Sequence, residues 1–248
     1  MALHRGPKIV TGGLVLCLDA GHKKSYSGSG TTWTDASRNG HNATLNNSPT
    51  YDGLSIIFDG TDQYTSQTSL PSVNVASDSY TMELWFKFIT LPTSDIQTDD
   101  GNGGPIYGQS YGSDYQLFAY AASDGKSHLG ACYDDSRSNA AHKSTATISA
   151  GEWVQFVQIG NPSGDADPSN TNRGKYTYYI NGVLDRATTL SSDSNGYSIP
   201  TTMHIAHDSR YNTNYSNLAM SAIHRYNREL TAEEILQNFN AMRGRFGL

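Results

Sequence analysis

The residue best placed for acid–base chemistry is Glu83, one of five glutamates in the chain. Hydrolysis of a glycosidic bond needs two carboxyl groups about 5–10 Å apart, one as the acid and one as the nucleophile or base. The positions two residues before and after Glu83, which would share its face of a strand, carry Thr81 and Trp85. Because no second carboxylate lies on that strand, we expect Glu83 to be a solvated residue and the chain not to be an enzyme.

Oxygen ligands for a metal ion occur in two places. Asp59 and Asp62 flank a glycine turn, and Asp165 and Asp167 begin a loop rich in Asp and Asn. Hard oxygen ligands at alternate positions suit calcium. However, the residue order of a self-contained calcium loop is missing, and Asp is also a common turn former. We therefore expect no cofactor, with calcium at these aspartates as the alternative.

The closest informative pair of histidines is His204 and His207, which are three residues apart. On a strand, this spacing directs the two side chains to opposite faces. We therefore expect them not to share a metal ion and to be ordinary surface or half-buried histidines.

Aromatic rings are the most abundant candidate binding groups, since the chain contains 16 tyrosines. Tyrosine offers a large contact area with little conformational entropy to lose, which serves both sugar stacking and protein interfaces. Two long polar segments, 91–111 and 161–175, are expected to be loops of the kind that carry function. The candidate sugar-stacking residues are Trp85, Tyr111, Tyr133 and Tyr211. The alternative is that many of these rings only cover sheet surface.

Composition narrows the class of protein. The net charge is −6 with no run of Lys or Arg, which argues against a nucleic-acid partner. No stretch approaches the 20 or so apolar residues of a membrane span, so we expect no membrane partner. The apolar run at 14–18 is short and no cleavage site follows it, so we expect synthesis in the cytoplasm without a signal peptide. Cys17 and Cys132 are expected to be small buried residues without a disulfide.

The elements that must position these groups are mostly short strands. The clearest is 80–88, where apolar residues alternate with others at the two-residue period of a strand. Asn181-Gly182 joins two further strand patterns and is the strongest local signal for a hairpin. Near the end, Thr231 and Glu234 form a capping box that begins a helix over about 231–243. Strand following strand with one terminal helix predicts an all-β, two-sheet antiparallel jelly-roll sandwich, as a single domain over 1–248.

Several segments together resemble the LamG-like, concanavalin A-like jelly-roll family. They are Ile57-Phe58-Asp59-Gly60, Tyr80 to Lys87, Gly151-Glu152-Trp153-Val154, Tyr179 to Val183 and Ile223 to Ile235. Their order and spacing across most of the chain carry the resemblance, which implies the same sandwich fold.

A narrower resemblance, to tailed-phage virion proteins that carry this fold, rests on both ends of the sequence. It is visible in Gly13-Leu14-Val15-Leu16, Leu18 to Gly21, Thr32 to Asp35, and Gln237 to Gly247. It implies a virion structural protein, such as a capsid-surface decoration, made in the host cytoplasm. The expected partners are major capsid or tail subunits, with a homo-oligomer on the particle. The alternative function is a carbohydrate-binding module of a tail or fibre that recognises host glycans.

Overall fold

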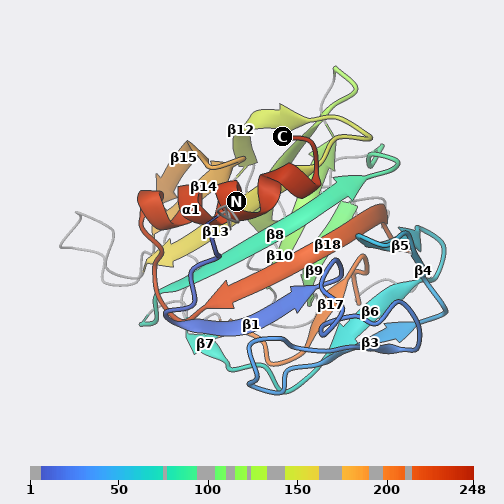
Figure 1. The fold of residues 1–248 in the computed structure, drawn as a ribbon. Coiled ribbons are helices and arrows are strands. Elements are labelled where there is room, and N and C mark those ends of the chain that lie inside the picture. The colour runs from blue at the N-terminus through green and yellow to red at the C-terminus, as the bar shows by residue number, and fades with distance from the viewer. Residues whose placement is uncertain are drawn as a thin grey trace, which may run out of the picture.

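A computed structural model of the chain describes nine segments. They are residues 7–74, 77–93, 104–109, 115–121, 124–132, 143–161, 175–189, 198–209 and 214–248. These segments form two antiparallel sheets packed face to face as a sandwich, with one short α-helix on the outside (Figure 1). The predicted fold class is therefore confirmed.

The first sheet, sheet A, has the strand order β15-β14-β13-β8-β18-β5-β4, and β1 pairs with one half of β18. Its strands are β1 (Leu14–Asp19), β4 (Thr50–Tyr51), β5 (Ile56–Asp59), β8 (Tyr80–Phe88), β13 (Val154–Asn161), β14 (Lys175–Ile180), β15 (Val183–Thr189) and β18 (Asn217–Tyr226).

The second sheet, sheet B, has the order β12-β11-β10-β9-β17-β6-β3-β2. Its strands are β2 (Thr32–Trp33), β3 (Ala43–Asn46), β6 (Tyr64–Gln67), β9 (Gly104–Gln109), β10 (Tyr115–Ala121), β11 (Ser127–Cys132), β12 (Lys143–Ile148) and β17 (Met203–Ile205). A separate two-stranded ribbon pairs β7 (Val73–Asn74) with β16 (Ser198–Ile199).

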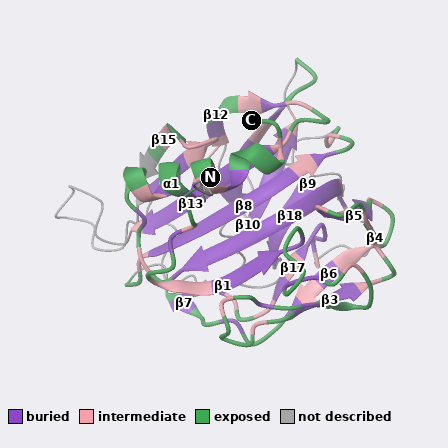
Figure 2. Cartoon of the chain, in the orientation of Figure 1, coloured by how far each residue is buried: buried purple, intermediate pink, exposed green. Residues whose placement is uncertain are grey.

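Strand β8 shows how the sequence pattern fixes the core. Its bounds, Tyr80–Phe88, are those predicted, and Met82, Leu84 and Phe86 point into the core between the sheets. The opposite face of β8 is also buried, in contrast to the wet face that the alternation predicts (Figure 2). The reason is a covering layer made by the C-terminal helix.

That helix, α1 (Ala232–Met242), lies across the outer face of sheet A and is followed by the 3₁₀ turn η2 (Arg243–Arg245) (Figure 1). Its N-cap is Thr231, whose hydroxyl accepts from the Glu234 backbone N–H, while the Glu234 carboxylate accepts from the Thr231 N–H. This is the predicted capping box. No helix in the described part of the chain is long and apolar enough to cross a membrane.

The hairpin between β14 and β15 has the predicted turn. Asn181 and Gly182 have φ values of 52° and 77°, as a type I′ turn requires. A Cβ atom at Gly182 would come within 3.0 Å of the Phe239 ring, so glycine also lets the turn pack closely against α1.

Segment 91–111 differs from its predicted loop, because residues 104–109 form β9, which pairs with β10 and β17. Ile106 and Tyr107 place their side chains in the core, and this burial outweighs the local loop signal of the neighbouring Gly and Pro residues. The described part of segment 161–175 is confined to its two ends, which belong to β13 and β14.

Candidate functional site

The predicted solvent-facing site at Glu83 and Trp85 is wrong, because both residues have 0% exposed surface. Trp85 is stacked between sheet A and the C-terminal region, with its ring 5.8 Å from Phe239 and 4.6 Å from Phe246. Trp85 is therefore a packing residue of the layer between sheet A and α1, where no sugar can stack on it.

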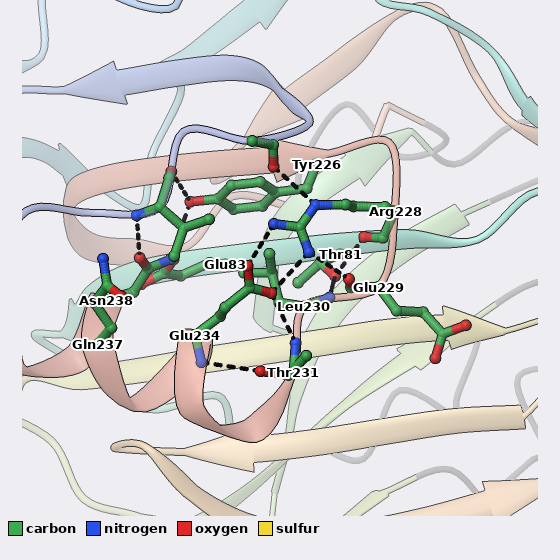
Figure 3. A network of polar contacts seen from close by, with 12 residues as sticks. Thr81, Glu83, Tyr226, Arg228, Glu229, Leu230, Thr231, Glu234, Gln237 and Asn238 are labelled. Carbon is green, nitrogen blue, oxygen red and sulfur yellow. Dashed lines mark hydrogen bonds and ion pairs between the residues drawn. The ribbon is translucent and has the colours of Figure 1, made fainter.

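The Glu83 carboxylate is the centre of a buried polar network. Figure 3 shows one side of this network, where Asn238 of α1 lies beside Glu83 and Tyr226. Its Oε1 accepts from Trp85 Nε1 at 3.0 Å and from Gln155 Nε2 at 2.7 Å. Its Oε2 accepts from Asn238 Nδ2 at 2.6 Å and lies 3.2 Å from His224 Nδ1. Both carboxylate oxygens are therefore fully used by neighbouring strands and by α1.

The electrostatics of this network favour a buried ion pair. Burial alone would raise the pKa of Glu83, but the charge of His224 and the hydrogen bonds lower it below its ordinary value. Burial would likewise lower the pKa of His224, yet contacts with Cys17 and Glu83 raise it well above the ordinary value. Glu83 and His224 therefore stabilise each other as carboxylate and imidazolium. The pair joins β8 to β18 and is buried, and the hydrogen bond from Asn238 ties it to α1.

The metal candidates that the structure describes are Asp59 and Asp62. Oδ1 of Asp59 accepts from the Thr61 N–H at 2.8 Å, a hydrogen bond within its own turn. Among the described residues, no group of three or more His, Cys, Asp or Glu side chains is placed to hold a metal ion. The candidates Asp165 and Asp167, and the aromatic candidates Tyr111, Tyr133 and Tyr211, lie outside the described residues.

Four aromatic rings come together on the outer face of sheet B, and we call Tyr64, His204, His207 and Tyr215 the ring cluster. His207 is stacked on Tyr215 at 4.4 Å with an interplanar angle of 9°. Tyr64 lies 4.9 Å from His207 and 5.8 Å from His204. Tyr64, His204 and Tyr215 are partly exposed. The cluster therefore presents aromatic surface outward from a sheet face that, in the part of the chain the structure describes, no helix covers.

The prediction that His204 and His207 point to opposite faces is wrong, since their rings are 5.5 Å apart. Strand β17 ends at Ile205, and Ala206 has a φ of 61°, which is rare for a residue with a Cβ. This left-handed residue breaks the strand alternation and turns His207 toward the side of His204. The chain then continues to a bridge between His207 and Tyr215.

Burial and the nearby His207 lower the pKa of His204 to about 4, although Asp208 acts in the opposite direction. His204 is therefore a neutral, flat ring near pH 7. Burial, Tyr64 and Asp62 raise the pKa of Tyr215, so its phenol is also neutral. His204 and Tyr215 consequently offer uncharged ring faces and neutral hydrogen-bonding groups at their edges.

Polar groups continue this surface across neighbouring strands. Thr44 is paired with Ser66, and Ser66 with His204, so three polar side chains form a row on the outer face. Asn46, paired with Tyr64, donates from Nδ2 to Ser66 Oγ at 3.1 Å. The residue opposite His204 on β9 is Gly108, which adds no side chain above the sheet. Together these positions make an aromatic surface bordered by hydroxyl and amide groups.

Sequence reasoning located this surface only in part. Tyr215 belongs to the tyrosine-rich second half of the chain, but its ring partners come from β6 and β17, which are distant in sequence. The short strand β6 has no clear alternation of apolar residues, and the conformation of Ala206 has no sequence signal. The available signals were the abundance of Tyr and the nearby His pair.

A sandwich of two antiparallel sheets with aromatic and hydroxyl groups on an outer face places the chain among the β-sandwich proteins, a class to which lectin domains belong. Residues 59–236 match the family model described as the concanavalin A-like lectin/glucanases superfamily, and the chain belongs to this family. The predicted LamG-like, concanavalin A-like resemblance is thereby confirmed. A search of curated protein sequences gives no match.

Solved structures with a similar fold include enzymes and a toxin domain. A mutant Trypanosoma rangeli sialidase that displays trans-sialidase activity aligns with a TM-score of 0.64 and 15% identity, over 95% of this chain and 34% of the sialidase. The T. rangeli sialidase in complex with sialic acid gives 0.63 and 16%, over 93% and 33%. The binding domain of botulinum neurotoxin serotype D gives 0.62 and 13%, over 93% of this chain and 52% of that one. This chain thus spans about a third of the sialidases and about half of the toxin domain.

These comparisons correct the prediction that the chain is not an enzyme. That prediction rested on the missing second carboxylate beside Glu83, but sialidases contain the same fold and the family includes glucanases. At 15–16% identity these likenesses establish the fold alone. The absence of a carboxylate pair on one strand is therefore no ground for excluding catalysis.

Proposed function

We propose that the chain is a carbohydrate-binding domain whose binding surface is the ring cluster with its polar border. The observation that carries this proposal is the gathering of four aromatic rings on the outer face of sheet B, which no helix of the described residues covers. Apolar faces of sugar rings stack on aromatic side chains, and their hydroxyls pair with groups such as Thr44, Asn46 and Ser66. The family includes lectins, and one structural neighbour is named as a toxin binding domain, which is consistent with a recognition role.

The test is glycan-array binding by the full chain, followed by calorimetry with the best glycan. We expect Tyr64→Ala and Tyr215→Ala each to weaken binding at least about tenfold, because each removes one ring that stacks on the sugar. Tyr179→Ala is the matched control, since Tyr179 is a partly exposed tyrosine of β14 in sheet A. Equal binding by wild type and both ring variants would refute the proposed surface, and no binding to any glycan would refute the function.

We further propose that the domain is attached to a phage particle, as a capsid-surface decoration in contact with capsid or tail subunits. The segments that resemble phage virion proteins lie at the two ends of the sequence, and they are joined in space. Arg245 Nη1 lies 2.8 Å from both carboxylate oxygens of Asp19, and Gln237 Nε2 donates to the Lys8 carbonyl at 2.7 Å. The two ends therefore supply one continuous surface that is suited to anchoring.

Quantitative mass spectrometry of purified particles tests this placement. Hundreds of copies per particle, measured against the major capsid protein, would support a head-coating role. A few copies up to a few dozen would move the domain to the tail. Absence from particles would refute the placement without touching the carbohydrate-binding proposal.

A further inference from the structure

A cleft of about 310 Å³ opens at the end of the sandwich where β18 finishes and β1 begins, beside the ribbon strand β7 (Figure 1). Its apolar walls include Val15 of β1 and Val73 of β7. This volume is at the lower end of the range for small-molecule sites, which suits a single sugar ring. The cleft lies apart from the ring cluster, which is built on β6, β17 and the segment around Tyr215.

The exposed charge at this cleft is negative. Asp78 is an exposed residue of the lining. Ser79, which also lines the cleft, donates from Oγ to Oε1 of the exposed Glu229 at 3.1 Å. Among the described residues, neither of these two carboxylates is part of an ion pair. A ligand that enters the cleft therefore meets one carboxylate in the wall and a second one a single hydrogen bond away.

The two arginines at this end of the sandwich are directed elsewhere. Arg225 is 1% exposed on the core side of β18, where its Nη2 donates to the Pro71 carbonyl at 2.6 Å. Arg228 donates from Nη1 and Nη2 to the two carboxylate oxygens of Glu234 at 2.7 and 2.6 Å, so this ion pair neutralises its charge. Since the two exposed carboxylates outnumber the one buried guanidinium that is left, the cleft keeps a net negative charge.

The Asp78 carboxylate can accept a further donor. Its Oδ1 accepts from Ser77 Oγ at 2.9 Å, and its Oδ2 accepts from the Asn74 N–H at 2.9 Å. An ionised carboxylate has about four acceptor positions, so these two hydrogen bonds fix the side chain and leave positions for a ligand. An ammonium group brings both N–H donors and a positive charge, and its hydrogen bond to a carboxylate is stronger than one between neutral groups.

The other lining groups suit the body of a sugar. Ser72 and Asn227 are exposed and offer a hydroxyl and an amide, while Val15 and Val73 offer apolar contact to C–H faces. We propose that the cleft binds an amino sugar, a monosaccharide with a free primary amine, with its ammonium group on the carboxylate of Asp78. This site is additional to the proposed carbohydrate-binding surface and uses none of its residues.

The test is a nuclear magnetic resonance titration of the full chain with D-glucosamine at about pH 6, where a primary amine of this kind is protonated. D-Glucose and N-acetyl-D-glucosamine are the matched probes, because they carry a hydroxyl or a neutral amide at C2 in place of the ammonium. We expect glucosamine to bind at least about threefold more tightly than either, with shifts at the backbone amides of Ser72, Ser79 and Asn227. Equal affinities, or shifts only elsewhere, would overturn the proposal. n-Butylamine is the fourth probe, and binding as tight as that of glucosamine would overturn the assignment to a sugar.

Asp78→Asn removes the charge and keeps the size of the side chain. We expect it to weaken glucosamine binding at least about threefold. Asp124→Asn is the matched control and should leave binding unchanged, since Asp124 is exposed and also accepts from a backbone N–H of its own turn.

Ser72→Trp is a second variant that does not depend on the 74–78 turn, because an indole at this exposed lining position would fill the cleft. We expect it to weaken glucosamine binding at least about tenfold. Unchanged binding by both folded variants contradicts the site. Tyr64→Ala should still bind glucosamine, which separates this test from that of the ring cluster.

Discussion

At the scale of single residues, Glu83 shows that a side chain on the outer face of a sheet can still be buried and closed to a ligand. The sequence places it beside Trp85 on what the alternation marks as the outer face of a strand, and that assignment of the face is correct. What the alternation could not reveal is that α1 covers the same face, because Asn238 and Phe239 reach β8 from a segment about 155 residues away. A charged residue on the outer face of a sheet is thus exposed only where no further layer lies over it.

The Glu83–His224 pair gives a prediction about stability. Glu83→Gln removes the charge that compensates His224, so we expect the free energy of unfolding near pH 7 to fall by about 3–5 kcal/mol. Urea unfolding measures this change. The control is Glu152→Gln at an exposed site, which should stay within about 0.5 kcal/mol of wild type. A similarly small change for Glu83→Gln would show that the pair contributes little.

The pair also predicts a dependence of stability on pH. The pKa of His224 is raised in the folded state, so its contribution is fully present below about pH 6.5 and is lost as pH rises through the folded pKa. The pKa of Glu83 is lowered, so its contribution is present above about pH 4.3 and is lost as pH falls. Unfolding free energies measured from pH 6 to pH 9 should therefore fall for wild type more than for Glu83→Gln. Parallel curves for the two proteins would contradict the assignment.

At the scale of elements, those that are determined by residues close together in the sequence could be predicted, and those that are determined by distant residues could not. The Asn181-Gly182 turn, the capping box of α1 and the bounds of β8 are set by neighbouring residues, and all three were predicted. The short strands β3 and β6 are instead set by pairing across the sheet, so their sequences carry little signal. The ring cluster depends on these short strands, which explains why the fold was more predictable than the site.

The N-cap of α1 gives a prediction at this scale. Thr231→Ala removes the hydroxyl that accepts from the Glu234 N–H, so we expect a loss of about 1 kcal/mol in unfolding free energy. Thr231→Ser keeps the hydroxyl and is the matched control, with stability expected close to wild type. Chemical denaturation of the three proteins measures the difference. Equal stability of the Ala and Ser variants would mean that packing on sheet A alone holds the helix start.

At the scale of the whole molecule, the two outer faces of the sandwich differ in how they are covered. Sheet A is covered by α1 and η2, and Phe246, which follows η2, packs on Trp85 there. On the opposite side of the core, sheet B bears the ring cluster in a region that no helix of the described segments covers. A domain anchored through its ends on the sheet A side would therefore hold the ring cluster outward, which joins the two proposals into one arrangement.

This arrangement gives a prediction about immobilised protein. A domain held on a streptavidin surface through a C-terminal biotin should bind its glycan with an affinity within about twofold of the free domain, because the ring cluster faces away from the attachment. The matched comparison places the biotinylated peptide between Asn47 and Ser48, an exposed turn that follows Asn46. Attachment there should reduce glycan binding at least about tenfold, since it sets the surface against the polar border of the cluster. Surface plasmon resonance measures both affinities. An equal loss of glycan affinity from both attachments would mean that the ring cluster and the chain end do not lie on opposite sides. If neither attachment changes the affinity, the binding surface lies elsewhere on the molecule.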